Sequence, residues 1–243
     1  MPFCELDYFS KALQKQTSVN LILPDPDAPK PWNVMFLLHG LSDNHTIWQR
    51  RTSIERYVEG LPLLVVMPDG GRSFYLDAVE GPAYGTAIGS ELPALISSYF
   101  ETTAEWSITG LSMGGYGAFK LALDHPSLFT SAVSHSGALH FGHAAYGRDD
   151  AFMQEFRRVT GVDHVGGPMD LHALVSSVDK MPKLRFDCGV DDFLLEANRD
   201  FKKHLDSNGI PHEYEEFSGD HSWSYWDEHV QEAIAFHRKN LGF

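Results

Sequence analysis

The sequence has little cysteine and no leader-like start. Its two cysteines, Cys4 and Cys188, lie far apart, and Cys188 falls in an apolar run that we interpret as a core strand. We therefore expect no disulfide framework, which fits a reducing compartment. The first residues have neither the basic start nor the apolar stretch of a secretory signal. These features favour a cytoplasmic protein.

Basic side chains and long apolar runs are also scarce. Lysine and arginine number 19 against 33 aspartates and glutamates, which gives a formal net charge of −14. Such a surface repels nucleic acid and anionic membranes, so we expect neither as a partner. No apolar run reaches the roughly 20 residues that a membrane-spanning helix needs. A small-molecule substrate fits these features, and homo-oligomerisation stays open.

The 243 residues carry no internal repeat or low-complexity block, so we expect one α/β domain over residues 1–243. An opening hairpin is predicted at Phe3–Leu13 and Val19–Leu23, closed by the proline-rich loop Pro24–Pro31. The further predicted strands are Trp32–Leu38, Leu61–Met67, Trp106–Thr109, Phe129–Ser134, Leu184–Gly189 and His212–Phe217. The predicted helices are Thr52–Glu59, one within 84–100, Gly117–Leu123, Glu196–Leu205 and Trp226–Arg238. Thr52 is the predicted N-cap of the first, and Glu55 completes a predicted capping box. This alternation predicts a mostly parallel central sheet with helices on both faces.

The segment 141–180 departs from this rhythm, because its periodicity weakens and several glycines and a proline break it. We expect a cap or lid over the site, since inserted segments between core strands vary without disturbing a fold. The alternative is a pair of packing helices, Ala151–Thr160 and Asp170–Lys180, without substrate contact.

The turn Gly110-Leu111-Ser112-Met113-Gly114 links a predicted strand to a predicted helix. A G-x-S-x-G turn in that context holds serine in a strained conformation and exposes its hydroxyl at the sheet edge, while glycines keep Cβ atoms out of the crowded turn. We therefore interpret Ser112 as a nucleophile. The alternative is a glycine-rich connection without a catalytic role.

Two further polar groups follow predicted strands. An aspartate, Asp191 or Asp192, comes after Leu184–Gly189, and His221 comes after His212–Phe217. The order nucleophile, acid, base is that of the α/β-hydrolase fold. In the mechanism that this order predicts, His221 removes the Ser112 proton, the aspartate orients the imidazole, and an acyl-enzyme forms.

Loops near these residues supply the rest of the expected site. Backbone N–H groups of Leu41, in the loop His39–His45, and of Met113 are expected to form an oxyanion hole. The aromatic residues Trp48, Tyr75 and Trp223 are candidates for an acyl pocket, with packing as the alternative. Asp69 and Arg72 are either substrate contacts or a satisfied loop pair. The histidines His135, His140, His143 and His164 lack a second cluster with metal-ligand spacing, so we expect no metal and no cofactor.

Four ordered motifs together resemble the esterase D and S-formylglutathione hydrolase-like group, with the nearest likeness to bacterial tributyrin esterases and acetyl esterases. They are Leu38–His45, Gly110–Gly117, Cys188–Leu194 and His221–Trp223. The resemblance implies an α/β-hydrolase with catalytic Ser112 and His221, an oxyanion hole from Leu41 and Met113, and a preference for short acyl groups. Esterases of this type carry Gly-x-x-Asp-Phe-Leu, which maps the acid onto Asp192. Formylglutathione hydrolases carry Asp-x-Phe-Leu, which would map it onto Asp191. We favour Asp192 and keep Asp191 as the alternative.

The resemblance favours a serine carboxylesterase for acetyl to butyryl esters, including acetylated sugars. An S-formylglutathione hydrolase is the second hypothesis, which the loop His-Gly-Leu-Ser-Asp weakens because those enzymes have Ser-Gly-Leu-Thr-Cys there. The third is a non-catalytic carbohydrate-binding protein on a hydrolase scaffold, for which we would expect one of the three catalytic residues to be missing.

Overall fold

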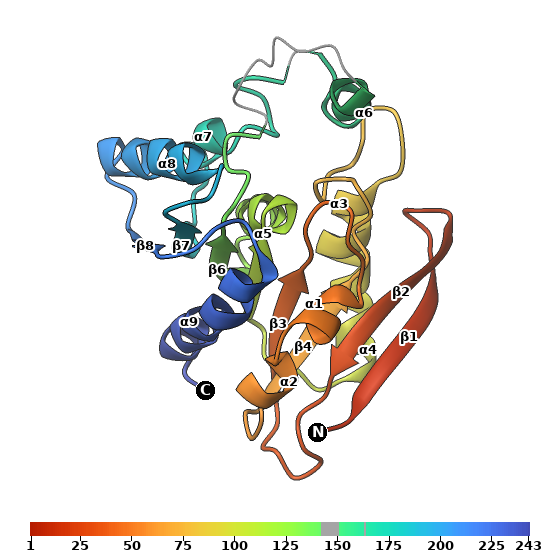
Figure 1. The fold of residues 1–243 in the computed structure, drawn as a ribbon. Coiled ribbons are helices and arrows are strands. Elements are labelled where there is room, and N and C mark those ends of the chain that lie inside the picture. Colours follow the sequence, from red (N-terminus) through yellow and green to blue (C-terminus); the bar gives the residue numbers. More distant parts are fainter. Residues whose placement is uncertain (142–150, 163) are drawn as a thin grey trace.

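A computed structural model describes residues 1–141, 151–162 and 164–243 of the chain. Within them, eight strands form one sheet in the order β1-β2-β4-β3-β5-β6-β7-β8 (Figure 1). The strands are β1 Phe3–Ser10, β2 Lys15–Ile22, β3 Asn33–Leu38, β4 Leu63–Pro68, β5 Trp106–Leu111, β6 Phe129–His135, β7 Lys183–Gly189 and β8 His212–Phe217. The pairs β1–β2 and β2–β4 are antiparallel, and the remaining neighbours are parallel.

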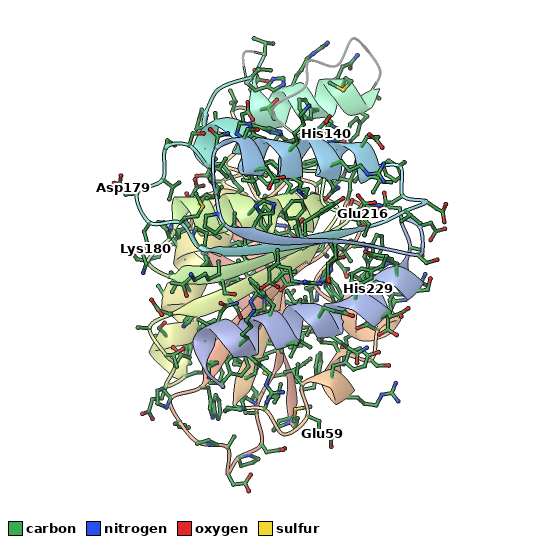
Figure 2. The ribbon with its side chains drawn as sticks, turned by 90° about the vertical axis from the view of Figure 1, so that its left-hand side faces the viewer. Glu59, His140, Asp179, Lys180, Glu216 and His229 are labelled. Atoms are coloured by element: carbon green, nitrogen blue, oxygen red, sulfur yellow. The ribbon has the colours of Figure 1, made fainter. Side chains whose placement is uncertain are left out.

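Helices lie between the strands along the chain. They are α1 Ile47–Arg51, α2 Ile54–Tyr57, α3 Tyr84–Thr86, the π-helical turn η1 Ala87–Glu91, α4 Leu92–Tyr99, α5 Met113–Asp124, α6 Ala151–Thr160, α7 Leu171–Leu174, α8 Leu195–Ser207 and α9 Trp223–Leu241. Figure 2 shows α8 and α9 on opposite sides of the sheet, which is seen nearly edge-on.

The alternation of side chains along a strand builds a core on each face. In β3, Val34 and Phe36 join a cluster with residues of α4, α5 and α8. Met35 and Leu37 join a second cluster with residues of α1, α2 and α9. Both faces of the central strands are therefore covered, which explains why they read as continuous apolar runs. The predicted mostly parallel sheet with helices on both faces is confirmed.

The opening hairpin differs from the prediction in its turn. The chain reverses at 11–14, where Gln14 has a φ of 54°, and the proline-rich loop follows the second strand instead of closing the hairpin. Glu91 of η1 fixes this reversal, since its carboxylate accepts hydrogen bonds from the Ser10 hydroxyl and from the N–H groups of Lys11 and Ala12. A contact 80 residues away in sequence thus sets the strand end.

Two predicted helices are shorter than expected. Thr52 is the C-cap of α1, where its hydroxyl donates to the Trp48 carbonyl at 2.5 Å and accepts the Ile54 N–H at 3.3 Å. The N-cap of the next helix is Ser53. The capping box is wrong, because Glu55 accepts from Gln49 Nε2. The alternative helix over Asp170–Lys180 has Asp170 as its N-cap, which accepts the N–H of residue 172, and it ends at Leu174.

The segment 141–180 contains α6 with the predicted bounds. Figure 1 places α6 away from the sheet, above α3 and α5 in that view. Residues 142–150 and 163 of this segment lie outside the described residues.

Candidate active site

Ser112 forms the sharp turn between β5 and α5. Its φ and ψ are 53° and −116°, a strained conformation that persists only where the surroundings enforce it. A Cβ at Gly110 would lie 2.1 Å from the Gly114 carbonyl oxygen, and one at Gly114 would lie 2.6 Å from the His39 carbonyl oxygen. The two glycines therefore allow the turn to form. The Ser112 N–H donates to the His135 carbonyl at 3.0 Å, which ties the turn to β6.

Ser112, His221 and Asp192 form a chain of hydrogen bonds. Ser112 Oγ lies 3.0 Å from His221 Nε2, and His221 Nδ1 lies 2.8 Å from Asp192 Oδ2. His221 lies in the loop after β8, and Asp192 in the loop after β7, so neighbouring parallel strands deliver both groups to one edge of the sheet. The side chain of Asp191 is exposed. The geometry is that of a nucleophile, a base and an orienting carboxylate.

Asp192 lies in a setting that favours its charged form. Burial raises the pKa of this carboxyl, but the hydrogen bonds from His221 and from the Leu194 N–H outweigh it, and the net pKa lies below the usual range. The Ser136 hydroxyl adds a further hydrogen bond in the same direction. Asp192 is therefore an anion at neutral pH and can hold the hydrogen on His221 Nδ1.

The two expected oxyanion donors flank Ser112. Met113 is the first residue of α5, where backbone N–H groups have no acceptor within the helix. Leu41 lies in the loop after β3, and a Cβ on the preceding Gly40 would lie 3.7 Å from Ser112 Cβ. One of these N–H groups follows the nucleophile and the other comes from the first core loop, the two places from which oxyanion donors come in α/β-hydrolases.

Two cavities open beside Ser112. A cavity of 290 Å³ is largely apolar, lined by Leu41, Phe74, Ser112, Met113, Ala138, His140, Phe141, Phe152, Met153, Phe156, Phe193 and Leu194. A cavity of 510 Å³ is more polar, lined by Gly40, Leu41, Ser42, Asp43, Arg51, Leu111, Ser112, Phe193, His221, Ser222, Trp223 and Trp226. Leu41, Ser112 and Phe193 belong to both linings. His221 lines only the second.

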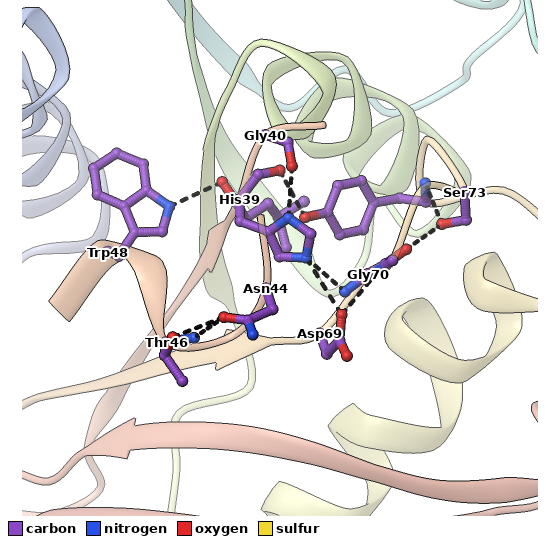
Figure 3. Close-up of polar contacts among 11 residues, drawn as sticks. His39, Gly40, Asn44, Thr46, Trp48, Asp69, Gly70 and Ser73 are labelled. Carbon is purple, nitrogen blue, oxygen red and sulfur yellow. Dashed lines mark hydrogen bonds and ion pairs between the residues drawn. The ribbon is translucent and has the colours of Figure 1, made fainter. Parts of the chain in front are cut away.

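The three aromatic residues predicted to form an acyl pocket have different positions in the structure. Trp223 lines the larger cavity. Trp48 and Tyr75 are buried and belong to neither lining; they donate to the carbonyl oxygens of Leu38 and His39 at 3.0 and 2.9 Å (Figure 3). Both are therefore parts of the scaffold under the loop that carries Leu41.

The two loop residues considered as substrate contacts have partners of their own. Arg72 forms two hydrogen bonds to Glu155 of α6, at 2.6 and 2.7 Å, and Asp69 accepts from the Gly71 N–H at 2.9 Å. Neither lines a cavity beside Ser112. Each residue thus has a partner, but the two do not pair with each other as the alternative expected, because Glu155 takes the Arg72 guanidinium.

The phenylalanines of the apolar cavity were not found by sequence reasoning. Phe74, Phe141, Phe152, Phe156 and Phe193 come from four separate segments of the chain. The one available signal was Phe193, directly after the acid. The others converge only through packing, such as the stacking of Phe74 on Phe141 with ring centroids 3.6 Å apart.

The histidines considered as metal ligands lie apart or have other partners. His135 is fully buried, with Nδ1 2.9 Å from Asp187 Oδ2, and His164 packs against the Phe156 ring. His143 lies outside the described residues. In residues 1–141, 151–162 and 164–243, no three histidine, cysteine, aspartate or glutamate side chains are grouped to hold a metal ion. Over the same residues, every helix is too short or too polar to cross a membrane.

A mostly parallel sheet with a strained serine turn, followed along the chain by an acid and a histidine, defines a serine hydrolase of the α/β-hydrolase fold. A model of the Esterase family matches residues 10–237, and the chain belongs to this family. It is 31% identical to an acetyl esterase of Caldicellulosiruptor saccharolyticus, over 98% of this chain and 99% of that protein. The protein is accordingly a carboxylic ester hydrolase.

Solved structures support the same assignment. The fluorophosphonate-binding serine hydrolase FphF of Staphylococcus aureus superposes with a TM-score of 0.86 and 30% identity, covering 96% of this chain and 97% of its own. The S-formylglutathione hydrolase FrmB of the same organism has a TM-score of 0.83 and 31% identity over the same shares of the two chains. A ferulic acid esterase of Anaeromyces mucronatus, 17% identical with a TM-score of 0.64 over 96% of this chain and 92% of its own, shares the fold. The predicted family resemblance is confirmed.

Proposed function

We propose that the protein hydrolyses short-chain acyl esters, from acetyl to butyryl and including acetylated sugars, with Ser112 as nucleophile. The observation that carries the proposal is the hydrogen-bonded series Ser112, His221 and Asp192 at the meeting point of two cavities. The similarity to an acetyl esterase supports the acetyl end of this range. We keep a cytoplasmic location as part of the proposal.

The reaction follows from these contacts. His221 Nε2 takes the Ser112 proton as Oγ bonds to the acyl carbon, and the carbonyl electron pair moves onto the oxygen, held by the N–H groups of Leu41 and Met113. The tetrahedral intermediate breaks its bond to the alcohol oxygen, which receives the proton from His221. Water, deprotonated by His221, then adds to the acyl-enzyme and releases the acid and Ser112.

The proton transfer from His221 to the leaving alcohol indicates which part of the substrate occupies each cavity. Because His221 must reach the oxygen of the leaving alcohol, the alcohol occupies the cavity that His221 lines. The acyl group then extends into the 290 Å³ cavity, whose wall is mainly phenylalanine and leucine. A polar alcohol fits the first cavity, where Ser42, Asp43 and Ser222 face it. An apolar acyl chain fits the second.

Helix α6 supports the proposal of a cap over residues 141–180. Phe152, Met153 and Phe156 of this helix line the acyl cavity, and Arg72 links the same helix to the loop after β4 through Glu155. In this proposal α6 bounds the acyl chain. Residues 1–243 then form one hydrolase domain that includes this cap.

S-formylglutathione hydrolysis is the second candidate, favoured by the 31% identity to FrmB. A glutathione leaving group brings carboxylates, which call for cations. The leaving-group cavity offers one arginine, Arg51, beside one carboxylate, Asp43. This charge balance favours a neutral alcohol. The presence of all three triad residues disfavours a non-catalytic carbohydrate-binding protein.

Hydrolysis of p-nitrophenyl acetate and butyrate tests the proposal. We expect turnover by the wild type, loss of turnover in Ser112→Ala, and labelling of the wild type alone by a fluorophosphonate probe. Parallel measurement with S-formylglutathione separates the two candidates through their kcat/KM values. Equal activity of Ser112→Ala and wild type would overturn the mechanism, and a thioester preference over all esters would favour the second candidate.

A further inference from the structure

Three consecutive carbonyl oxygens at the end of β3 are each held by a buried side chain. The Leu38 carbonyl accepts from Trp48 Nε1 at 3.0 Å, and the His39 carbonyl accepts from the Tyr75 hydroxyl at 2.9 Å. The Gly40 carbonyl accepts from the ring of His39 itself, with Nδ1 at 2.7 Å. Figure 3 shows these contacts around the His39 ring. The backbone that leads to Leu41 is thus fixed residue by residue.

A second contact fixes which nitrogen of the His39 ring carries the hydrogen. The Gly70 N–H donates to His39 Nε2 at 2.8 Å, which requires a lone pair on that nitrogen. The ring hydrogen is therefore on Nδ1, where it donates to Gly40. Asp69 Oδ1 lies farther from Nε2, at 3.6 Å. The loop after β4 thus determines that the ring hydrogen of His39 is on the nitrogen that contacts the loop after β3.

The position of Gly70 is fixed in turn. Its carbonyl accepts from the Ser73 hydroxyl at 2.7 Å, and the same hydroxyl accepts from the Tyr75 N–H at 2.9 Å. A Cβ on Gly70 would lie 2.4 Å from the Tyr75 ring, so the glycine backbone and this ring are in direct contact. Tyr75 therefore supports both sides of the His39 ring.

The planarity of the peptide bond between Gly40 and Leu41 fixes the direction of the Leu41 N–H. The Gly40 carbonyl and the Leu41 N–H belong to one planar trans peptide, so they point in opposite directions. With the carbonyl held on the His39 ring, the Leu41 N–H points away from that ring. Gly40, Leu41 and Ser112 line one cavity together.

We propose that His39 is a positioning residue for the reaction: its Nδ1–H holds the Gly40 carbonyl and thereby aims the Leu41 N–H at the oxyanion. Tyr75 and Trp48 assist by holding the two preceding carbonyls. The Asp43 N–H also reaches the Gly40 carbonyl, at 3.3 Å, but this longer backbone contact does not link the loop to Gly70. The inference rests on the proposed function, because it assigns a support for the oxyanion donor of that mechanism.

Two substitutions at one position separate the donor from the volume of the side chain. His39→Leu removes the donor, whereas His39→Asn keeps an N–H close to the place of Nδ1. Complete loss of an oxyanion donor costs about 10²–10³-fold in rate. We expect His39→Leu to lower kcat for p-nitrophenyl acetate by about 10- to 100-fold with KM within about threefold, and His39→Asn to recover most of that loss.

A transition-state analogue supplies a second readout. A trifluoromethyl ketone forms a tetrahedral adduct with serine that carries the oxyanion. Its inhibition constant should therefore rise by the same factor by which kcat/KM falls in His39→Leu. A loss of folded protein would lower the active fraction without this parallel change. Counting active sites with a fluorophosphonate probe normalises each kcat.

His237 provides a matched control. It is another fully buried histidine whose ring nitrogens both have partners, Thr109 Oγ1 at 2.7 Å and Ser131 Oγ at 2.8 Å, and it does not contact the loop after β3. His237→Leu should lower the melting temperature and leave kcat per active site unchanged. If His39→Leu does not fold, Tyr75→Phe removes a single hydroxyl from the same scaffold and should lower kcat by about three- to tenfold with KM unchanged.

The proposal is overturned if kcat per active site of His39→Leu, or of Tyr75→Phe where the former does not fold, stays within twofold of wild type. It is also overturned if His39→Asn is no better than His39→Leu, or if the inhibition constant does not follow kcat/KM. Failure of the proposed function gives a different result, because the wild type itself would then show no hydrolysis that depends on Ser112.

Discussion

Asp192 Oδ2 lies 2.8 Å from His221 Nδ1, while the adjacent Asp191 side chain is exposed to solvent. Asp192→Asn should lower kcat by about 10³- to 10⁴-fold, because an amide at this place no longer holds the hydrogen on Nδ1. Asp191→Asn is the matched control and should stay within about threefold of wild type. Steady-state kinetics with p-nitrophenyl acetate measure both. A larger loss in Asp191→Asn would move the acid to that residue.

Gly110→Ala should disrupt the serine turn, because the new Cβ would lie 2.1 Å from the Gly114 carbonyl oxygen. Overpacking of this kind costs about 1–3 kcal/mol or more, and displacement of a catalytic group by about 1 Å costs up to 10²-fold in rate. Gly209→Ala introduces a Cβ with no atom within 4 Å and a φ of +64°, so we expect backbone strain alone and unchanged kcat. Thermal melts and active-site-normalised kcat distinguish the two variants. Normal turnover in Gly110→Ala would contradict the turn geometry.

Phe156→Leu should broaden the acyl preference, because Phe156 is buried and lines the proposed acyl cavity. One methylene in an apolar pocket is worth about 10-fold or more in discrimination, so we expect the ratio of kcat/KM for octanoate over acetate to rise by about fivefold or more. Phe201→Leu, at a buried phenylalanine of α8 outside both cavities, is the control. An octanoate-to-acetate ratio that is unchanged in Phe156→Leu would instead place the acyl group in the other cavity.

The burial of His237 predicts that the protein becomes less stable as the pH falls. Burial lowers the pKa of His237 to about 3, and the nearby His135 adds to the effect. The unfolded chain binds a proton at this residue below about pH 6.5, whereas the folded protein does so only near pH 3, so its contribution to stability falls as the pH falls through this window. Between pH 7 and pH 5 the free energy of unfolding should fall by about 2 kcal/mol from this group.

Urea denaturation of wild type and His237→Gln at pH 5, 6 and 7 measures this effect. The variant is expected to be less stable at pH 7, because the contacts with Thr109 and Ser131 are lost. The difference between the two proteins should shrink by about 2 kcal/mol at pH 5, since the variant has no proton to gain. A difference that stays constant with pH would show that His237 is not the responsible group.

Local signals in the chain were sufficient for most of the architecture. The strand His212–Phe217 has the predicted bounds, because it depends on its own periodicity. The helix Ala151–Thr160 also has the bounds given for it, although the periodicity of its segment is weak. The predictions failed where a distant group competes with a local one. Glu91 sets the end of the first strand. At the start of α2 the N-cap is Ser53, one residue after the predicted Thr52, and Asp227 of α9 accepts the Ser53 N–H.

By itself the sequence determined the fold class, the serine turn and the order of the candidate triad, because these depend on neighbouring residues and on where strands end. The motif resemblance favoured Asp192 over Asp191, but only the tertiary structure shows that the Asp192 carboxylate reaches the His221 ring, 29 residues away. It also moved Trp48 and Tyr75 from a supposed pocket to the support of the Leu41 loop. The physical reason is the same in each case. The sequence gives the type of a side chain, but its hydrogen-bond partner depends on which group the fold brings within about 3 Å of it.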